Sequence, residues 1–335
     1  MSLNNTDKYP VINGGIDFLG YTNKFNVSKN TIAISEGGTC GYVRFMTSDF
    51  WSGGHNYSLQ KISNKVNNLC LYHILKSYEK DIMKLGVGSG LKNIQLKALK
   101  DFKILLPPLD EQIAIANVLS DVDRYLYALD ALILKKESVK KALRIKMLNQ
   151  ILASNRVEFK KIGEICLIKR GRVIEKKILQ ENGKYPVYSS QTLNNGILGF
   201  IDTYDFDGEF LTWTTDGAYA GSVFYRNGRF SITNVCGLLQ VIQDNIIHKY
   251  LYYILQITAP LHVNPGMGNP KLMSAAMQQI EILLPPLNEQ IAIANILSAL
   301  DNEIISLKNK KRQFENIKKA LNHDLMSAKI RVLKK

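Results

Sequence analysis

The chain has 335 residues, of which 46% are hydrophobic, so it can form about two domains with cores of their own and is not a disordered chain. Its net charge of +14 favours a polyanionic partner, with nucleic acid as the first candidate and a lysine-rich compositional bias as the alternative. No apolar run reaches the ~20 residues of a membrane span, and the polar N-terminus has no signal-peptide core, so we expect a cytoplasmic protein that binds no membrane.

The first hundred residues are expected to form a mixed α/β domain. Apolar runs at Thr31–Ile34 and Tyr42–Phe45 alternate with glycine-containing turns, as is typical of strands. Leu69–Tyr78 carries apolar residues on one helical face and predicts a helix. The apolar run Phe102–Leu106 predicts a strand that ends at a pair of prolines.

A long repeat follows. Residues 104–120 read ILLPPLDEQIAIANVLS, residues 282–298 read ILLPPLNEQIAIANILS, and fifteen of the seventeen positions are identical. The differences, Asp110/Asn288 and Val118/Ile296, exchange one good helix N-cap for another and one small apolar side chain for another. Because each copy follows about a hundred residues of other sequence, the chain is expected to be an internal duplication.

The apolar period becomes helical after each proline pair, in the first copy from about Asp110 to about Ala153. Spacings of three and four residues form a stripe that is typical of a coiled coil. The stripe consists of Leu119, Val122, Leu126, Leu129, Ile133, Leu143 and Met147 in the first helix, and of Leu297, Leu300, Ile304, Leu307, Lys311, Phe314, Leu321 and Leu325 in the second. Apolar and lysine positions exchange places between the copies, which favours two helices that pack against each other.

Residues 155 to about 280 are expected to form a second globular domain, which opens with a strand and a short helix at Val157–Ile165. Tyr185–Tyr188 matches Tyr9–Ile12, but identity between the globular parts is far lower than between the helix entries. Two variable domains on repeated helices are expected if each half reads a different ligand. Neutral drift after the duplication is the alternative.

The motifs of several enzyme classes are missing. The proline pair at Pro107 and Pro108 lies between leucines, so it is not the N/D-P-P-Y/F tetrapeptide of an amino-methyltransferase, and there is no phosphate-binding G-x-x-x-x-G-K-[ST] loop. The glycines of residues 86–90 do not follow a strand of a βαβ unit, and the four cysteines and five histidines do not cluster. We therefore expect no catalytic site, no cofactor and no metal, and the cysteines are expected to be free thiols.

Polar and basic loop residues are the candidate DNA contacts, because arginine, amide and hydroxyl groups suit phosphates and base edges. In the first half these candidates are Asn13, Lys24, Ser35, Glu36, Thr39 and His55. In the second half they are Lys169, Arg170, Arg172, Ser189, Ser190, Gln191, Thr214, Thr215, Asp216 and Tyr219. For each of them, an ordinary solvated turn is the alternative.

The doubled P-P-L-[DN]-E-Q-I-A-I-A-N-[VI]-L-S entry, placed after each variable domain, resembles the specificity subunit of type I restriction–modification enzymes. The resemblance implies an α+β fold in which two pseudo-two-fold related mixed α/β target-recognition domains are separated by two long helices that form an antiparallel coiled coil. It places the recognition domains at residues 1–108 and 155–286, and the helices at residues 109–154 and 287–335, the latter with a C-terminal tail.

The resemblance also implies the partners: double-stranded DNA, two modification (methyltransferase) subunits and, through them, restriction subunits. Catalysis would belong to those partners, so this chain would be no enzyme and would read a bipartite, asymmetric DNA site with one half-site per domain. A DNA methyltransferase with a fused recognition domain is the alternative function, and a basic coiled-coil scaffold without a DNA role is another.

The helix entries are the candidate partner surface, because the repeat keeps Glu111–Gln112 and Glu289–Gln290 identical. A local role at the helix dipole is the alternative for the glutamates. The first domain is short at its N-terminus, since only seven residues precede Lys8–Val11, whereas the matching Lys184–Val187 follows nearly thirty residues of its own domain. Residues 330–335 partly repeat residues 156–161, so the C-terminal tail is expected beside the first domain, where it could supply part of the missing edge.

Overall fold

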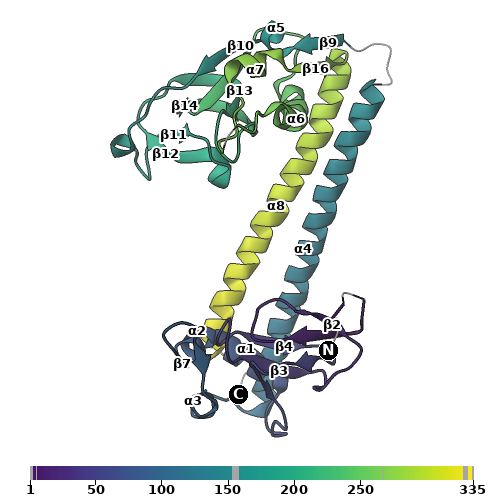
Figure 1. The fold of residues 1–335 in the computed structure, drawn as a ribbon, viewed down its shortest axis with the longest axis vertical. Coiled ribbons are helices and arrows are strands. Elements are labelled where there is room, and N and C mark those ends of the chain that lie inside the picture. Colours follow the sequence, from purple (N-terminus) through teal and green to yellow (C-terminus); the bar gives the residue numbers. More distant parts are fainter. Residues whose placement is uncertain (1–2, 5, 153–157, 267, 327–330, 334–335) are drawn as a thin grey trace. The chain divides into compact units, whose positions relative to one another are not determined.

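The computed structural model describes residues 3–4, 6–152, 158–266, 268–326 and 331–333. It divides into two compact units, of which unit 1 comprises Met1–Leu132 with Leu307–Lys335, and unit 2 comprises Ile133–Ser306. Two long helices, α4 (Leu109–Leu152) and α8 (Leu287–Met326), belong to both units. Each unit therefore contains one globular part and one stretch of each long helix (Figure 1).

The globular part of unit 1 has two small sheets. In one, β3 (Thr31–Ser35) pairs antiparallel with both β4 (Val43–Met46) and β6 (Asn56–Leu59). In the other, β1 (Tyr9–Ile12) pairs antiparallel with β2 (Gly20–Thr22) and parallel with β5 (Trp51–Ser52). The remaining elements are α1 (Asn68–Ser77), α2 (Glu79–Met83), β7 (Gly86–Val87), β8 (Asn93–Ile94) and α3 (Leu96–Lys100).

Unit 1 is held by a core between the β3 sheet and α1, in which Ile32, Ile34, Val43, Leu71 and Leu75 are buried. The apolar face predicted for Leu69–Tyr78 is the face of α1 that enters this core. The helix begins where the Asn67 side chain accepts a hydrogen bond of 2.9 Å from the Cys70 amide, a typical N-cap.

Unit 2 has a six-stranded sheet with the order β10-β15-β13-β14-β11-β12. The strands are β10 (Cys166–Arg170), β11 (Tyr185–Tyr188), β12 (Ile197–Ile201), β13 (Phe206–Thr214), β14 (Val223–Ile232) and β15 (Cys236–Val241). Helices α5 (Ile162–Ile165), α6 (His248–Thr258) and α7 (Ser274–Gln279) accompany it, together with a two-stranded pair, β9 (Glu158–Lys161) and β16 (Glu281–Leu284). Short 3-10 turns lie at η1 (Lys176–Ile178), η2 (Leu193–Gly196) and η3 (Ala259–His262).

Trp213 lies at the centre of the unit 2 core. It is fully buried, and its indole N–H donates to the Leu272 carbonyl at 2.9 Å. The ring packs on the face of Gly237, where an added Cβ would meet ring atoms at 2.0 Å. A glycine is therefore required on β15, opposite the tryptophan of β13.

The prediction of a strand at Phe102–Leu106 is wrong, because these residues do not form a strand in the structure. The matching segment of the second half is β16, whose partner is β9. The described part of unit 1 contains no counterpart of β9, so residues 102–106 lack a partner whose backbone could pair with theirs.

The long helices pack along the predicted stripe and run antiparallel, since rising numbers on α4 meet falling numbers on α8. In unit 1, Lys318 pairs with Asp123, and Lys311 pairs with Asp130 at 2.7 Å. In unit 2, Lys136 pairs with Glu303 at 2.8 Å, and Lys140 pairs with Asp301. These four lysines, of which Lys311 belongs to the stripe, thus have acidic partners on the facing helix. The apolar stripe members Leu119, Leu129, Ile133, Leu297 and Ile304 are buried.

Helix α4 begins at Leu109, one residue before the expected start, and the Pro108 carbonyl accepts the first helical hydrogen bond from Gln112 at 2.9 Å. Asp110 is therefore inside the helix and is not its N-cap. The expected helix end at Ala153, the boundary at residues 154–155 and the first residue of the expected strand at Val157 lie outside the described residues.

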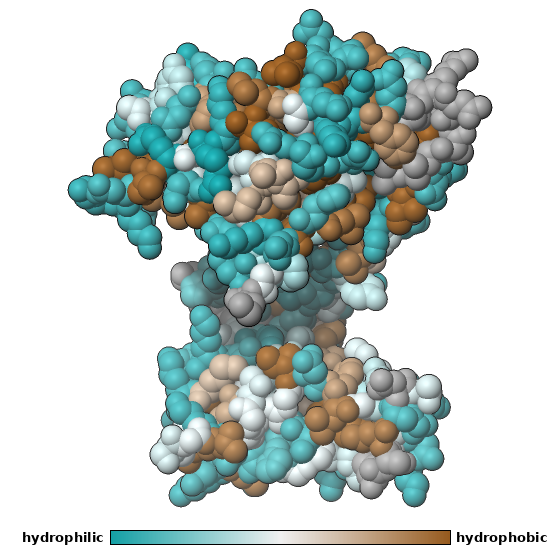
Figure 2. Space-filling view, turned by 45° about the horizontal axis from the view of Figure 1, so that its top comes forward, coloured by the Kyte–Doolittle hydropathy of each residue, from teal (hydrophilic) through white to brown (hydrophobic). Residues whose placement is uncertain are grey.

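The face in view is mostly hydrophilic, with groups of hydrophobic residues between the hydrophilic ones in both units (Figure 2). Among the described residues, no helix is long and apolar enough to cross a membrane.

Candidate nucleic-acid and partner interfaces

Most first-half DNA candidates converge where the β1–β2 loop meets the turn after β3. The His55 amide donates to the Asn13 side chain at 3.1 Å, and the Glu36 amide donates to the His55 carbonyl at 2.9 Å. The Thr39 amide donates to the Gly14 carbonyl at 2.8 Å. Asn13, Glu36, Thr39 and His55 are thus brought together from three separate segments of the sequence.

Two other first-half candidates lie differently. Ser35 is buried at the end of β3, so its side chain is not accessible to a ligand. Lys24 is exposed in the segment between β2 and β3 and makes none of the hydrogen bonds described above. The Glu36 carboxylate is fixed in place because it accepts a hydrogen bond of 3.1 Å from the Tyr57 hydroxyl.

The basic candidates of the second half lie at the β10 edge of the sheet. Lys169 and Arg170 are exposed at the end of β10, where the Arg170 guanidinium donates to the Asn234 carbonyl at 2.5 Å. The exposed Arg172 pairs with Asp205, with 3.0 Å between Nε and a carboxylate oxygen. These three cations stay accessible to an anionic ligand.

The β11–β12 loop, residues 189–196, carries Ser189, Ser190 and Gln191. The Ser189 amide donates to the Gly196 carbonyl at 3.0 Å, which closes the loop. The Ser189 hydroxyl accepts a hydrogen bond of 3.0 Å from the Thr233 hydroxyl, and the side-chain amide of Gln191 donates to the Ile197 carbonyl. Ser190 is half-buried between them.

Thr214 and Thr215 are fully buried, contrary to the expectation that their hydroxyls face base edges. The Thr214 hydroxyl donates to the Tyr219 carbonyl and accepts from the Ser222 amide, so it holds the turn between β13 and β14. Asp216 is half-buried on this turn, and Tyr219 is 50% exposed. Of these four candidates, Asp216 and Tyr219 are the ones that a ligand can reach.

Sequence reasoning missed Arg226, which lies on β14 and is 3% exposed. Its guanidinium carbon is 3.5 Å from the ring centroid of Tyr188 and 4.6 Å from that of Phe224, and its Nε donates to Thr212 at 3.1 Å. Burial lowers the pKa of Arg226 to about 10. A lone arginine among the alternating residues of a strand gives no sequence signal of this environment.

The helix entries are built on a buried glutamine in each half. Gln112 is 2% exposed, accepts from the Asn67 amide at 2.8 Å, and donates to the Lys65 and Pro107 carbonyls at 3.2 and 2.8 Å. Its repeat counterpart Gln290 is 1% exposed and makes the equivalent bonds.

Gln290 accepts from the Ile247 amide at 3.0 Å and donates to the Asn245 and Pro285 carbonyls at 3.0 and 2.9 Å. The glutamines are thus not the exposed partner surface that was expected. They fasten the first turn of each long helix to the segment that precedes α1 or α6.

Glu111 is also buried, because the C-terminal tail covers it. Its carboxylate accepts hydrogen bonds from the Val332 amide at 2.6 Å and from the Leu333 amide at 3.1 Å. Val332 packs against a cluster that includes Leu119 and Leu325. The tail therefore lies beside the first domain, as expected, while Glu289 is half-buried at the second entry.

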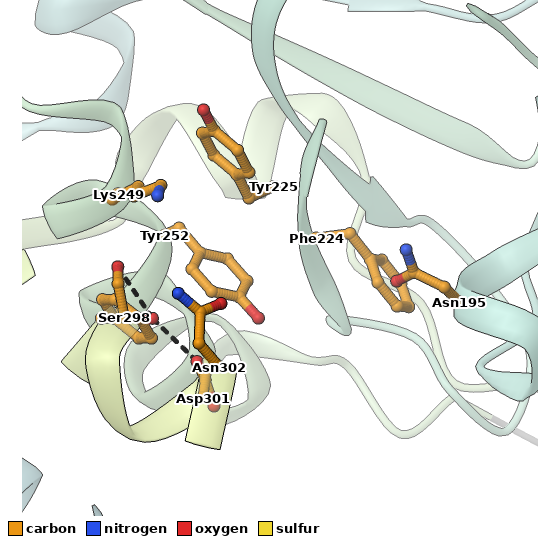
Figure 3. A pocket seen from close by; sticks show the side chains of 9 residues that line it. Asn195, Phe224, Tyr225, Lys249, Tyr252, Ser298, Asp301 and Asn302 are labelled. Atoms are coloured by element: carbon orange, nitrogen blue, oxygen red, sulfur yellow. Dashed lines mark hydrogen bonds between the residues drawn. The ribbon is translucent and has the colours of Figure 1, made fainter. Parts of the chain in front are cut away.

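A pocket of about 200 Å³ lies within unit 2, between β14, α6, α8 and the β11–β12 loop (Figure 3). Tyr225, Tyr252 and Phe224 contribute aromatic rings, and Asn195 and Asn302 contribute amides. The Tyr253 hydroxyl donates to Asp301 at 2.7 Å. Among the described residues, no group of three histidine, cysteine or acidic side chains could hold a metal ion.

The four cysteines are free, with Cys70, Cys166 and Cys236 buried and Cys40 half-buried. Burial raises the pKa of Cys70 to about 11 and the pKa values of Cys166 and Cys236 to about 12. Their thiols are therefore poor nucleophiles at neutral pH.

Relatives among known proteins agree with this architecture. A Mycoplasma pneumoniae protein, named for the N-terminus of a type I specificity subunit, is 53% identical over 138 residues, which are 41% of this chain and 74% of that protein. The specificity subunit of the M. pneumoniae type I restriction enzyme MpnII is 48% identical over 141 residues, so the match spans 42% of each chain.

The fold itself has a solved counterpart. The crystal structure of the S subunit of a type I restriction–modification system from M. genitalium matches with a TM-score of 0.80 and 24% identity, over 97% of this chain and 90% of that one. The family described as the type I restriction modification DNA specificity domain matches residues 2–137 and again residues 155–316. The chain therefore belongs to the family of type I restriction–modification specificity proteins.

Proposed function

We propose that this chain is the DNA-binding specificity subunit of a type I restriction–modification enzyme and reads a bipartite, asymmetric site. The observation that carries the proposal is the double match of one DNA specificity family, once in each half. We place the recognition domains at residues 1–108 and 155–286, each reading one half-site. The chain would act in the cytoplasm, where it reaches double-stranded DNA.

The chemistry of the candidate surfaces supports DNA binding. The chain carries 43 lysines and arginines against 29 acidic residues, and three of these cations are accessible at the β10 edge. Such groups release counterions when they neutralise phosphates. The accessible polar candidates Asn13, Gln191 and Asp216 lie on turns that the surrounding hydrogen bonds hold in place, as readout of base edges requires.

The long helices, residues 109–154 and 287–335, are proposed to set the spacing of the half-sites and to dock two modification subunits, which recruit restriction subunits. Methylation and cleavage would then be carried out by these partners, and this chain would have no catalytic role. A methyltransferase with a fused recognition domain is not favoured, because the specificity family accounts for both halves and the sequence lacks the N/D-P-P-Y/F tetrapeptide.

Methylome sequencing tests the proposal. The chain is expressed with its modification subunits in a host without other methyltransferases, and the expected result is one bipartite motif with a fixed run of unread bases. Exchanging residues 158–279 for the equivalent domain of a relative should change one half-site and leave the other intact. A contiguous motif, or a change in both halves at once, would contradict the proposal.

A further inference from the structure

The β1–β2 loop, residues 13–19, and the β11–β12 loop, residues 189–196, are equivalent in the two halves. In each half the strand that enters the loop pairs antiparallel with the strand that leaves it, and parallel with a second strand, β5 or β14. Both loops carry predicted DNA contacts, Asn13 in the first and Ser189, Ser190 and Gln191 in the second.

In unit 1, Arg44 of β4 binds the backbone of the β1–β2 loop. Its guanidinium donates to the Gly15 carbonyl at 2.8 Å and also to the Ile16 carbonyl. It stacks near two rings, with its carbon 5.4 Å from the centroid of Phe18 and 5.1 Å from that of Tyr42. Phe18 belongs to the loop, so Arg44 contacts its side chains and its backbone together.

In unit 2, Arg226 of β14 lies against both ends of the β11–β12 loop. It stacks on Tyr188, the residue before the loop, and its Nη2 approaches Gly196, the last residue of the loop. An added Cβ at Gly196, which has a φ of +82°, would lie 3.0 Å from this nitrogen. The close approach and the backbone conformation both favour glycine there. The next residue back, Asn195, lines the same pocket as Phe224, the other ring beside Arg226 (Figure 3).

The two arginines are not repeat counterparts. Val43 faces Ile34 across β3 and β4, as Val223 faces Trp213 across β13 and β14. Arg44 is one residue after Val43, whereas Arg226 is three residues after Val223. Because side chains alternate along a strand, both positions lie on the same face.

The counterpart of Arg226 in unit 1 is Met46, which is buried, and the counterpart of Arg44 in unit 2 is Phe224. Each position therefore accepts an apolar side chain in the other half of the same chain. A buried guanidinium also carries a cost of desolvation, and Nη1 of Arg226 has no hydrogen-bond partner among the described residues. Packing alone is thus a poor account of why each half keeps an arginine beneath this loop.

We propose that Arg44 and Arg226 are positioning residues for DNA readout, each holding one loop in the conformation that reads bases in its own half-site. The inference rests on the function proposed above. Arginine suits this role because its planar group stacks on aromatic rings while donating several hydrogen bonds, which lysine cannot do.

The test uses the full chain with its modification subunits, and methylome sequencing as the measurement. Arg226→Met and Arg44→Phe each install the side chain that the other half carries at that position. Arg226→Met should reduce discrimination at the bases of one half-site by tenfold or more and leave the other unchanged, and Arg44→Phe should do the reverse. Arg229→Gln, on the same strand as Arg226 but exposed and paired with Asp207, removes a charge as the control and should leave both half-sites unchanged.

The outcomes separate this inference from the proposed function. If the wild-type chain gives no bipartite motif, the proposed function fails and the inference with it. If the wild-type motif is bipartite but both variants keep every base preference, the positioning role alone is overturned. The third outcome is a variant that loses methylation at all sites and also loses the wild-type circular-dichroism spectrum or co-purification with the modification subunit. That result would also overturn the role, because it would show that the arginine is needed only for folding or assembly.

Discussion

At the scale of single residues, the hydrogen bonds of Gln112 and Gln290 explain in part why the sequences of the two helix entries are nearly identical. Each glutamine uses its side-chain carbonyl oxygen and both amide hydrogens on three backbone groups, two in the segment before α1 or α6 and one at the first proline before the long helix. Shorter or charged side chains cannot reproduce this set, because the site is closed to water and needs one acceptor and two donors.

Replacing either glutamine with leucine should therefore destabilise the chain. Gln290→Leu removes the partner of the Ile247 amide and of the Asn245 and Pro285 carbonyls, of which the Pro285 bond is buried, so the free energy of unfolding should fall by about 2–4 kcal/mol. Urea denaturation followed by circular dichroism measures the change. Asn295→Ala, equally identical in the repeat but exposed, is the matched control and should cost less than about 0.5 kcal/mol. Equal losses in the two variants would refute the structural role.

His73 packs in the interior at a cost to its protonated form. It is buried on α1, and burial lowers its pKa to about 4, with Asp123 opposing and Lys318 reinforcing the shift. The unfolded chain binds this proton near its ordinary pKa of 6.5 and the folded chain binds it only near 4. The contribution of His73 to stability is therefore complete above pH 6.5 and declines as the pH falls towards 4.

At the scale of elements, Gln112 and Gln290 are buried and cannot contact a partner, so the candidate partner surface is expected on another face of the helix entries. Ile113 and Ile291 are identical in the repeat and 44% and 42% exposed, and Asn117 and Asn295 follow four residues later on the same face. Exposed apolar residues kept in both copies suit two equivalent docking sites for one kind of partner.

The double substitution Ile113→Lys with Ile291→Lys should leave the chain folded and reduce co-purification with the modification subunit at least tenfold. A lysine at the centre of an apolar contact would be buried without a counter-charge in the complex and solvated in the free chain. Lys substitutions at the exposed Leu134 and Ile305, which are not repeat counterparts, are the control. Full recovery of the partner by the folded double variant would exclude this face.

Sequence patterns predicted elements well where the pattern is local. The helical stripe, α1, β3 and β4 each follow from spacing within one segment. The missing strand at residues 102–106 could not be predicted in this way, because whether it forms depends on a partner such as β9. The same holds for the site: loop positions such as Asn13 and Gln191 carry a compositional signal, whereas the inward orientation of Thr214 and the role of Arg226 depend on contacts between strands.

At the scale of the whole molecule, the proposed spacing of the half-sites depends on the length of the helix pair. Inserting seven residues after Leu132 in α4 and seven before Leu307 in α8 keeps the coiled-coil phase and adds about 10 Å of helix. The unread run of bases in the motif should then grow by about three base pairs. Methylome sequencing reports the new spacing, and insertion in α4 alone, which leaves the two antiparallel helices unequal in length, should abolish methylation. An unchanged spacer in a functional double insertion would show that the helices do not set it.

The division of the chain into units also fixes an order of events during synthesis. Unit 2 is one continuous stretch, whereas unit 1 needs residues from both sides of it. The ion pair between Asp123 and Lys318 joins residues 195 positions apart, so it forms only after the ribosome has translated Lys318, which follows the whole of unit 2. Until then the first domain lacks its contacts with the second half of α8, whereas unit 2 can complete its own helix contacts earlier. The globular part of unit 1 is thus translated before unit 2 and finishes folding after it. Any translational pause before residue 307 prolongs the exposure of the apolar face of α4 that α8 covers.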